Sequence, residues 1–252
     1  MKIQLIRHAT VVLEIHGKTL LVDPMFSARG TLSPVKDVKN QDKNPLVDLP
    51  VPINRLFDCD ALLLTHLHRD HFDEAAINVL PKDMRIFCQP KDEAGLKASG
   101  FMNTVPVKRN VLWEKIRIFR TPARHGHGAT ALAMAPVSGY VLHSPDEPVV
   151  YISGDSIFYS GTKKILERHQ PDIAVCNCGE AAFACGRPIT MGIGDLLKMC
   201  SYDTAIKIAA VHMEAWNHCG LTRDALKRSL TENRLNGRVF VPEDGETVEF
   251  RK

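Results

Sequence analysis

The sequence predicts an α/β protein in which helix-covered sheets pack on one another, and three observations support that prediction. Short β-rich segments dominate the first half of the chain, whereas strand and helix segments alternate in the second half. Apolar residues make up 44% of the 252 residues and charged residues 24%, which allows a sizeable core without disulfide staples. We find no internal linker, repeat or low-complexity tract, so we expect one domain over residues 1–252.

The expected strands are short apolar or β-branched runs bounded by turn residues. They lie at residues 2–6, 11–15, 19–22, 61–64, 85–88, 111–119, 149–152, 172–176 and 206–211, with a pair of strands within 130–142 and two short strands near the end of the chain. Helices are expected from Asp73, as N-cap, to about residue 80, and at residues 91–98, 163–169, 194–200 and 222–230. Residues 24–58 carry five prolines and little periodicity, which predicts a long irregular loop. A pocket lid and a surface excursion are equally good interpretations of that loop.

Composition and charge argue against some partners. Lys and Arg exceed Asp and Glu by 32 − 29 = 3, so no strong charge directs the chain to nucleic acid or to an anionic membrane. The seven cysteines are odd in number and scattered, which is typical of free thiols in a reducing compartment. Residues 1–17 lack an uninterrupted apolar signal core, and no window approaches the roughly 18 apolar residues of a membrane span. We therefore expect a cytoplasmic protein without a membrane span, of unknown oligomeric state.

The segment THLHRDHF, residues 65–72, places three histidines and one aspartate directly after a buried strand. His66 and His68 are two residues apart and share a face of extended chain, so both can reach one cation. Asp70 and His71 come as the chain turns toward the next helix, and they point elsewhere. Four such side chains around one small ion would be crowded, so we expect them to divide between two adjacent metals. Imidazole and carboxylate without thiolate fit Zn²⁺, Mn²⁺ or Fe²⁺.

Three further segments place ligand-type side chains after expected strands. TPARHGHG carries His125 and His127, SGDS carries Asp155, and AAVHMEAW carries His212. Ligand groups gather beyond strand ends because the loops there are free to vary. Each segment alone is a weak signal, and the residues themselves leave His125 and His127 as alternatives.

The ordered set T-H-L-H-R-D-H, T-P-A-R-H, S-G-D-S and V-H-M-E, with an early L-L-V-D-P, resembles the metallo-β-lactamase-fold superfamily. It is most similar to the branch of ascorbate-6-phosphate lactonases and N-acylphosphatidylethanolamine phospholipase D enzymes. The resemblance extends from about residue 3 to residue 230, and it implies a four-layer αββα sandwich of two mixed sheets with the site at one edge between them.

The resemblance also implies a role for each ligand. One metal would be held by His66, His68 and His125, the second by Asp70, His71 and His212, and Asp155 would bridge both. The spacing T-P-A-x-H favours His125 over His127. Asp23 matches an aspartate of the family that braces the metal ligands.

These features predict hydrolysis by a water shared between two divalent ions, Zn or Mn, with Fe as a further option. Such ions, about 3.5–4 Å apart, lower the pKa of a bound water from 15.7 to about 7 and need no serine or cysteine nucleophile. Asp70 would orient the water and accept its proton. His218 is a candidate to face the substrate or donate a proton, although a residue at a helix start is the plainer interpretation. The metal charges less two aspartates and a hydroxide leave about one positive charge, which favours a small anionic ester, lactone or phosphodiester as substrate.

Three alternatives remain. A di-iron redox protein of the same fold would carry glutamate where this chain has His68, and an RNA-processing nuclease would need a basic arm. A non-catalytic metal-binding sensor does not require all seven proposed ligands. The other histidines, His8, His16, His143 and His169, are interpreted as structural or surface residues.

Overall fold

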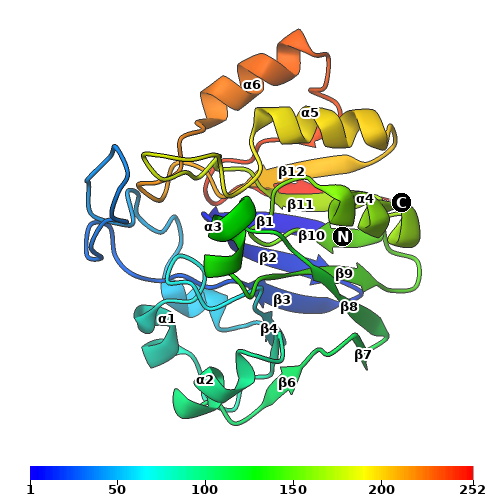
Figure 1. Ribbon diagram of the computed structural model, residues 1–252. Coiled ribbons are helices and arrows are strands. Elements are labelled where there is room, and N and C mark those ends of the chain that lie inside the picture. The colour runs from blue at the N-terminus through cyan, green and yellow to red at the C-terminus, as the bar shows by residue number, and fades with distance from the viewer. Residues whose placement is uncertain (252) are drawn as a thin grey trace.

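The structure is a computed structural model that describes residues 1–251, and it contains two seven-stranded sheets packed face to face with helices outside both (Figure 1). The strands are β1 Lys2–Arg7, β2 Thr10–Ile15, β3 Lys18–Val22, β4 Ala61–Leu63, β5 Ile86–Cys88, β6 Thr104–Pro106, β7 Asn110–Trp113, β8 Ile116–Pro122, β9 Ser138–His143, β10 Val150–Ile152, β11 Ile173–Asn177, β12 Lys207–Val211, β13 Val239–Phe240 and β14 Thr247–Glu249. The helices are α1 Glu74–Val79, α2 Glu93–Ala98, α3 Gly128–Ala133, α4 Ser160–His169, α5 Ile193–Tyr202 and α6 Arg223–Glu232, with a 3-10 turn, η1, at Ile53–Leu56. The expected αββα sandwich is therefore confirmed.

Both sheets mix parallel and antiparallel strands. The first sheet has the order β14-β1-β2-β3-β4-β5-β6, and β3 to β6 run parallel. The second has the order β13-β12-β11-β10-β9-β8-β7, and β10 to β13 run parallel. β1 is antiparallel to β2, and β2 to β3, so β1 shares the direction of β3 and β4. The carboxyl ends of these strands gather at one edge of each sheet, where open α/β sheets carry ligand groups.

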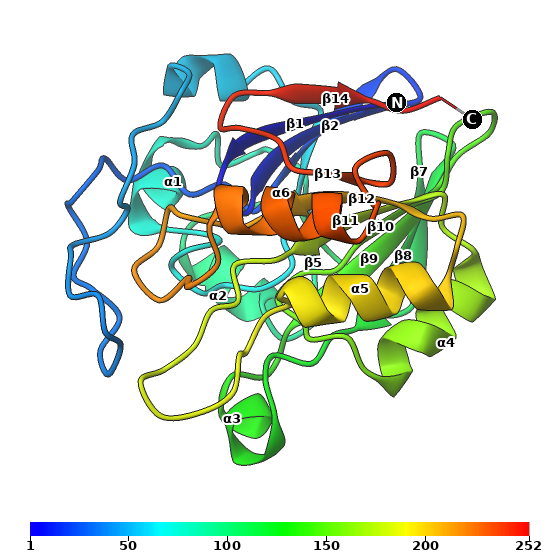
Figure 2. The same cartoon turned by 90° about the horizontal axis from the view of Figure 1, so that it is seen from above.

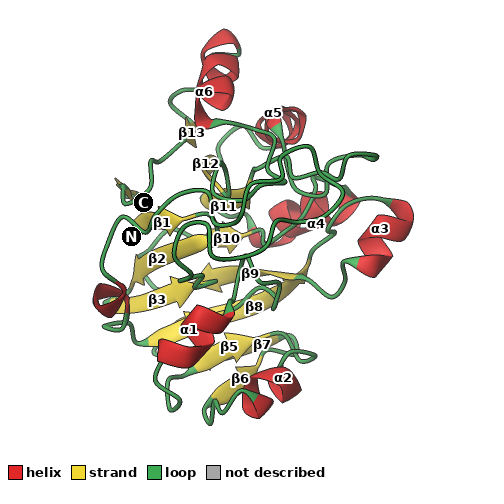
Figure 3. Cartoon of the chain, turned by 90° about the vertical axis from the view of Figure 1, so that its left-hand side faces the viewer, coloured by secondary structure: helices red, strands yellow, loops and turns green. Residues whose placement is uncertain are grey.

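Apolar side chains fill three layers because successive residues of a strand face opposite sides. Ala61 and Leu63 pack between the sheets, whereas Leu62 and Leu64 pack under α1 and α2. β11 and β12 likewise turn one face to the other sheet and one face to α4, α5 and α6. Figure 2 shows α5 and α6 alongside the second sheet, and Figure 3 shows α1 over the first. Burial of both faces explains why these strands are continuous apolar runs in the sequence.

Two expected elements are wrong in detail. The strand pair expected within residues 130–142 is the helix α3 followed by β9, because Ala and Leu in the segment GATALA are strong helix formers. The single strand expected at 111–119 is a hairpin of β7 and β8. Its turn residues, Glu114 and Lys115, have φ values of 48° and 64°, which suit the tight turns that reverse a chain.

Two local expectations are confirmed. Asp73 caps α1 by accepting a hydrogen bond from the backbone N–H of Ala76 at 2.8 Å. All seven cysteines are free thiols. Within residues 1–251, no helix combines the length and the apolar character needed to cross a bilayer.

The segment 24–58 is irregular, as expected, apart from η1 and an isolated β-bridge. It is nevertheless fixed to the body of the protein. The buried guanidinium of Arg7 donates to the carbonyls of Met25, Ser27 and Val47 at 2.9–3.0 Å. Burial lowers the pKa of Arg7 to about 10, so the side chain stays charged at neutral pH. A buried cation that binds three carbonyls of the segment fixes its path at residues 25–27 and at residue 47.

Candidate metal centre

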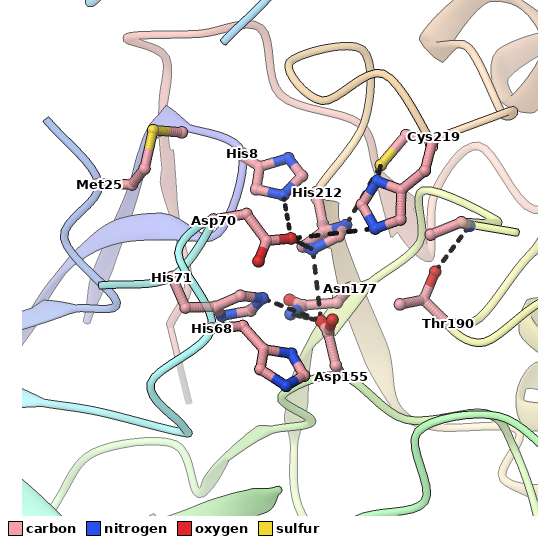
Figure 4. Close-up of polar contacts among 12 residues, drawn as sticks. His8, Met25, His68, Asp70, His71, Asp155, Asn177, Thr190, His212 and Cys219 are labelled. Carbon is pink, nitrogen blue, oxygen red and sulfur yellow. Dashed lines mark hydrogen bonds and ion pairs between the residues drawn. The ribbon is translucent and has the colours of Figure 1, made fainter. Parts of the chain in front are cut away.

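Ligand-type side chains that follow strands of both sheets meet in one buried cluster (Figure 4). Those of the first sheet are His8 after β1, Asp23 after β3, and His66, His68, Asp70 and His71 after β4. Those of the second are His125 after β8, Asp155 after β10 and His212 after β12. The seven side chains expected to bind metal are thus brought together, although the segments that carry them lie up to 146 positions apart (212 − 66).

The seven side chains form two groups. In the first ligand group, His66, His68 and His125, one nitrogen of each ring lies within 4.8 Å of the others. In the second ligand group, the same limit holds for one atom each of Asp70, His71, Asp155 and His212. The groups contain the side chains that the resemblance assigned to each metal, with Asp155, which the resemblance assigned to both metals, in the second group.

Asp155 faces both ligand groups. Its Oδ1 lies 3.2 Å from Nε2 of His71 and 3.3 Å from Nε2 of His212, both in the second group. Its Oδ2 lies 3.3 Å from Nε2 of His125, in the first group. Asn177 donates from Nδ2 to the same Oδ1 at 2.7 Å and so fixes the plane of the carboxylate. One carboxylate therefore presents one oxygen to each group.

Buried atoms without hydrogen bonds give an argument for metal binding beyond the types of residue present. Nε2 of His71, Nε2 of His212 and Oδ2 of Asp155 are buried, and within residues 1–251 none has a hydrogen bond of good geometry. Leaving a buried polar atom unsatisfied costs about 1–3 kcal/mol, so several of them facing one space call for a ligand. A divalent cation satisfies such lone pairs directly. The cluster is able to bind metal.

Outer hydrogen bonds turn the coordinating nitrogens inward. Nδ1 of His71 lies 2.8 Å from Oδ2 of Asp23, and Nδ1 of His125 lies 2.9 Å from the carbonyl of Ile189. Each acceptor selects the ring form that carries its hydrogen on Nδ1, which leaves the lone pair of Nε2 for a metal. Asp23 thus lies where the resemblance implied, beside a proposed ligand.

The pKa values of the cluster follow from burial and from the contacts between aspartates and histidines. Burial raises the pKa of Asp155, but His212, His71 and His125 around it hold the net value well below its usual range. Burial lowers the pKa of His212 to about 3. Burial also lowers the pKa of His71, but Asp155 and Asp23 at its two ring nitrogens raise the net value well above the usual one. A metal that binds His71 must therefore displace a tightly held proton.

The two remaining candidate residues lie differently. His127 is half-buried at the N-terminal end of α3 and belongs to neither ligand group. His218 is buried, and its Nε2 lies 4.0 Å from Oδ2 of Asp70. Burial lowers the pKa of His218 to about 4, so the ring is neutral at pH 7.

Three residues at the cluster were missed in the sequence analysis. His8, interpreted as structural or surface, is fully buried, with Nε2 3.4 Å from Oδ2 of Asp70 and its ring 3.6 Å from that of His212. Cys219 lies with Sγ 3.7 Å from Nδ1 of His212, and Asn177 bonds Asp155 as described. His8 and Asn177 stand at strand ends, the same signal that identified His212.

A cavity of about 220 Å³ opens beside the cluster. It is lined by Val35, His68, Arg69, Asp70, His125, Met134, Phe183, Trp216 and His218. Four of these are apolar, and Arg69 is the one cation among the lining residues that the structure describes. Its guanidinium already donates to Ser33, to Oγ at 3.0 Å and to the carbonyl at 2.7 Å. The lysines of the 24–58 loop and Arg29, considered as contacts to an anionic substrate, do not belong to this lining.

Known proteins resemble the chain over most of its length. The family model described as the beta-lactamase superfamily domain matches residues 18–213. The UPF0173 protein YddR of Bacillus subtilis is 39% identical over 99% of this chain and 100% of its own length. A UPF0173 metal-dependent hydrolase of Caldivirga maquilingensis is 32% identical over 70% of this chain and 73% of its own length.

A solved structure also matches the chain over nearly its whole length. The crystal structure of isothiocyanate hydrolase from Delia radicum gut bacteria superposes with a TM-score of 0.96 at 36% identity, and the match covers 99% of each chain. The narrower branch that the motifs resemble stays a prediction. The chain belongs to the β-lactamase superfamily and, within it, to the UPF0173 group of metal-dependent hydrolases.

Proposed function

We propose that the chain is a hydrolase that uses two divalent metal ions, Zn or Mn, one in each ligand group, to activate a water. The observation that supports this most directly is the placement of Asp155, whose two oxygens face different groups. A single-metal site does not need a carboxylate shared in this way, whereas two-metal hydrolytic sites do. Nε2 of His71 and Nε2 of His212, which lack a hydrogen bond of good geometry among the described residues, support a bound ion in the second ligand group.

When bound, the ions supply Lewis acidity and a water of lowered pKa. The protein then supplies position and proton transfer. Asp70 lines the cavity, and its carboxylate is held by His8, so it can orient a water and accept its proton. His218 also lines the cavity, and as a neutral imidazole it can donate one hydrogen bond to a substrate oxygen or to the leaving group. Trp216 and Phe183 exclude bulk water from one side of the cavity.

Two substrate classes follow from two different observations. The charge count favours a small anionic ester, lactone or phosphodiester, which Arg69 would help to bind. The apolar lining favours a small uncharged electrophile instead, and the relative from Delia radicum gut bacteria is an isothiocyanate hydrolase. In that reaction the oxygen of water bonds to the central carbon of R–N=C=S, the C–N bond breaks, and the nitrogen takes both protons. The products, an amine and carbonyl sulfide, account for every atom.

The test is metal removal and restoration on a substrate panel. Three preparations are compared: the protein as isolated, the protein dialysed against chelator, and the dialysed protein after addition of Zn²⁺ or Mn²⁺. Each is assayed with aryl esters, lactones, bis-aryl phosphates and alkyl isothiocyanates. We expect turnover of at least one class, lost with the metal and recovered with two ions per chain. Turnover that ignores chelation, or recovery complete at one ion, would overturn the two-metal proposal.

The same preparation separates the other candidate functions. An iron content near two with a charge-transfer band would indicate the di-iron redox protein. Cleavage of RNA but not of bis-aryl phosphates would indicate the nuclease. Ligand-induced stabilisation without turnover of any panel member would indicate the sensor.

A further inference from the structure

Asn217 ties the part of the 24–58 loop that borders the cavity to the body of the protein, in addition to the hydrogen bonds that Arg69 donates to Ser33. Asn217 follows the cavity residue Trp216 in sequence and is 5% exposed. Its Oδ1 accepts hydrogen bonds from the backbone N–H of Val35 at 3.0 Å and from Nδ2 of Asn44 at 2.8 Å. Its Nδ2 donates to the carbonyl of Val35 at 3.2 Å and to that of Asn40 at 2.7 Å. A carboxamide has two acceptor and two donor positions, so all four are in use.

Backbone hydrogen bonds continue the same attachment. The N–H of Asn217 donates to Oδ1 of Asn44 at 2.8 Å, and the N–H of Leu46 donates to the carbonyl of Ala215 at 2.8 Å. Residues 35–46 of the loop are thus attached along residues 215–217. Two side chains of this attachment depend on residue type, Asn217 on the body and Asn44 on the loop, and Asn217 makes the bonds to Val35 and Asn40.

This chemistry selects asparagine. Aspartate has the same shape but no donors, and it would turn an oxygen toward the carbonyls of Val35 and Asn40. A small apolar side chain would leave the same carbonyls and the N–H of Val35 without this partner in a partly buried place. The attachment therefore depends on a carboxamide at position 217.

The attachment leads directly to the cavity. Val35 is the one residue of the 24–58 loop in the cavity lining that the structure describes, and both its N–H and its carbonyl are held by Asn217. Asn217 itself does not belong to the lining. Any effect of Asn217 on substrate selection must therefore act through the loop residues that it holds.

We propose that Asn217 is a positioning residue that determines substrate specificity. It holds residues 35–44 as a fixed wall, and Val35 on that wall limits the size of the substrate group that lies against it. The loop is in this view a wall and not a moving lid. The inference rests on the proposed function, since the cavity must be the substrate site.

The wall itself is tested without any substrate. Hydrogen exchange followed by mass spectrometry compares N217D with the matched variant N233D, which makes the same change at an exposed asparagine of the α6 end. We expect amides of residues 33–45 to exchange at least about tenfold faster in N217D, with β11 and β12 unchanged. Loop exchange equal to the wild type, or equal acceleration throughout the protein, would overturn the proposal. If N217D does not fold, N44A removes the two hydrogen bonds that the Asn44 side chain makes with Asn217, and it is judged by the same result.

Access to the cavity gives a second readout. The chain has two tryptophans, so a W113F background leaves Trp216 as the single tryptophan, whose emission is excited selectively over that of the four tyrosines. We expect acrylamide to quench Trp216 about twofold more strongly in N217D, because a loosened wall admits small solutes more often. N233D should not change the quenching. Unchanged quenching in N217D would show that the wall does not control access.

Specificity is tested by a double-mutant cycle with Val35 on the substrate class found active. V35A and N217D should each lower the preference for a compact over a bulky substrate, mainly through KM, and the double variant should lower it no further than the larger single effect. Additive effects would mean that Asn217 does not act through Val35. If no panel substrate is turned over, the proposed function fails. Hydrogen exchange and quenching still test whether Asn217 holds residues 35–44 in place.

Discussion

The two ligand groups differ in charge and in burial. The first group, His66, His68 and His125, is made of three imidazoles, and its member His68 is half-buried and lines the cavity. The second group, Asp70, His71, Asp155 and His212, contains both carboxylates, and all four side chains are buried. Two anionic ligands offset the charge of a divalent ion better than neutral rings do, so we expect the second group to bind its ion more tightly.

The surroundings of the two groups reinforce this difference. Around the second group, Asp23 holds His71, Asn177 holds Asp155, and His8 packs on His212. Such outer contacts typically change metal affinity by about 10- to 100-fold when they are removed. The first group has contacts from Thr65 and from a backbone carbonyl. If each group binds an ion as proposed, we expect the ion of the second group to be held more firmly, although both groups reach the cavity, the first through His68 and His125 and the second through Asp70.

The largest expected effect comes from removing the ligand that the groups share. In D155N the side chain keeps its shape but loses the charge that serves both groups. We expect turnover to fall by at least about 10³-fold and bound metal to fall below two ions per chain, measured by elemental analysis after gel filtration. D224N, the same change at an exposed position on α6, should leave both quantities at wild-type values. Two ions retained in D155N would show that Asp155 does not bridge.

A smaller loss of activity is expected when a ligand of only one group is removed, and the metal that each variant retains distinguishes the two groups. H68A removes a ligand of the first group, so it should retain about one ion per chain and regain part of its activity in excess metal. H71A removes a ligand of the second group and should lose the ion that wild-type protein releases last during graded chelation. Both should lower turnover by about 10²-fold or more at limiting metal. Equal retention of metal by H68A and H71A would contradict the difference between the groups, and H16A serves as the surface control.

Local chemistry and the family resemblance explain why the clustering of the candidate ligands was predictable from the sequence. The motif at residues 65–72 crowds residue types that seldom occur together without a metal, and the strand ahead of it fixes the direction of its side chains. The two-sheet architecture was predictable for a related reason, since buried strands are short apolar runs whatever their partners. The helix α3 was not predictable. A run such as ALAMA fits the apolar periodicity of a strand as well as that of a helix, and the helix buries none of its side chains.

The contacts that hold the ligands in place were not predictable, because they exist only after distant segments meet. His8 stands at a strand end, which places it at the edge of its sheet, but nothing around it in the sequence indicates that its ring will pack on that of His212. Asn217 binds the carbonyl of Asn40 across 177 positions. Spacing rules describe neighbours along a helix or strand, and they carry no information on such pairs.

The smallest expected effect concerns pH and the protein freed of metal. Burial lowers the folded-state pKa of His212 to about 3 and of His218 to about 4, whereas both take up protons near 6.5 in the unfolded chain. The unfolded state therefore binds more protons as pH falls below 6.5, and stability decreases. His71 acts in the opposite sense, because its raised pKa gives a contribution that is present at low pH and lost as pH rises through the folded-state value.

The lowered histidines outnumber the raised one, so the metal-free protein should lose about 1–3 kcal/mol of unfolding free energy between pH 7 and pH 5. Urea unfolding in the presence of chelator measures this, and H218N should flatten the slope by less than one proton per chain. The decrease should be steeper in the metal-loaded protein, because protons also displace the ions from their ligands. A metal-free protein that gains stability on acidification would mean that His71 and its two aspartates, and not the buried neutral histidines, dominate the electrostatics of the cluster.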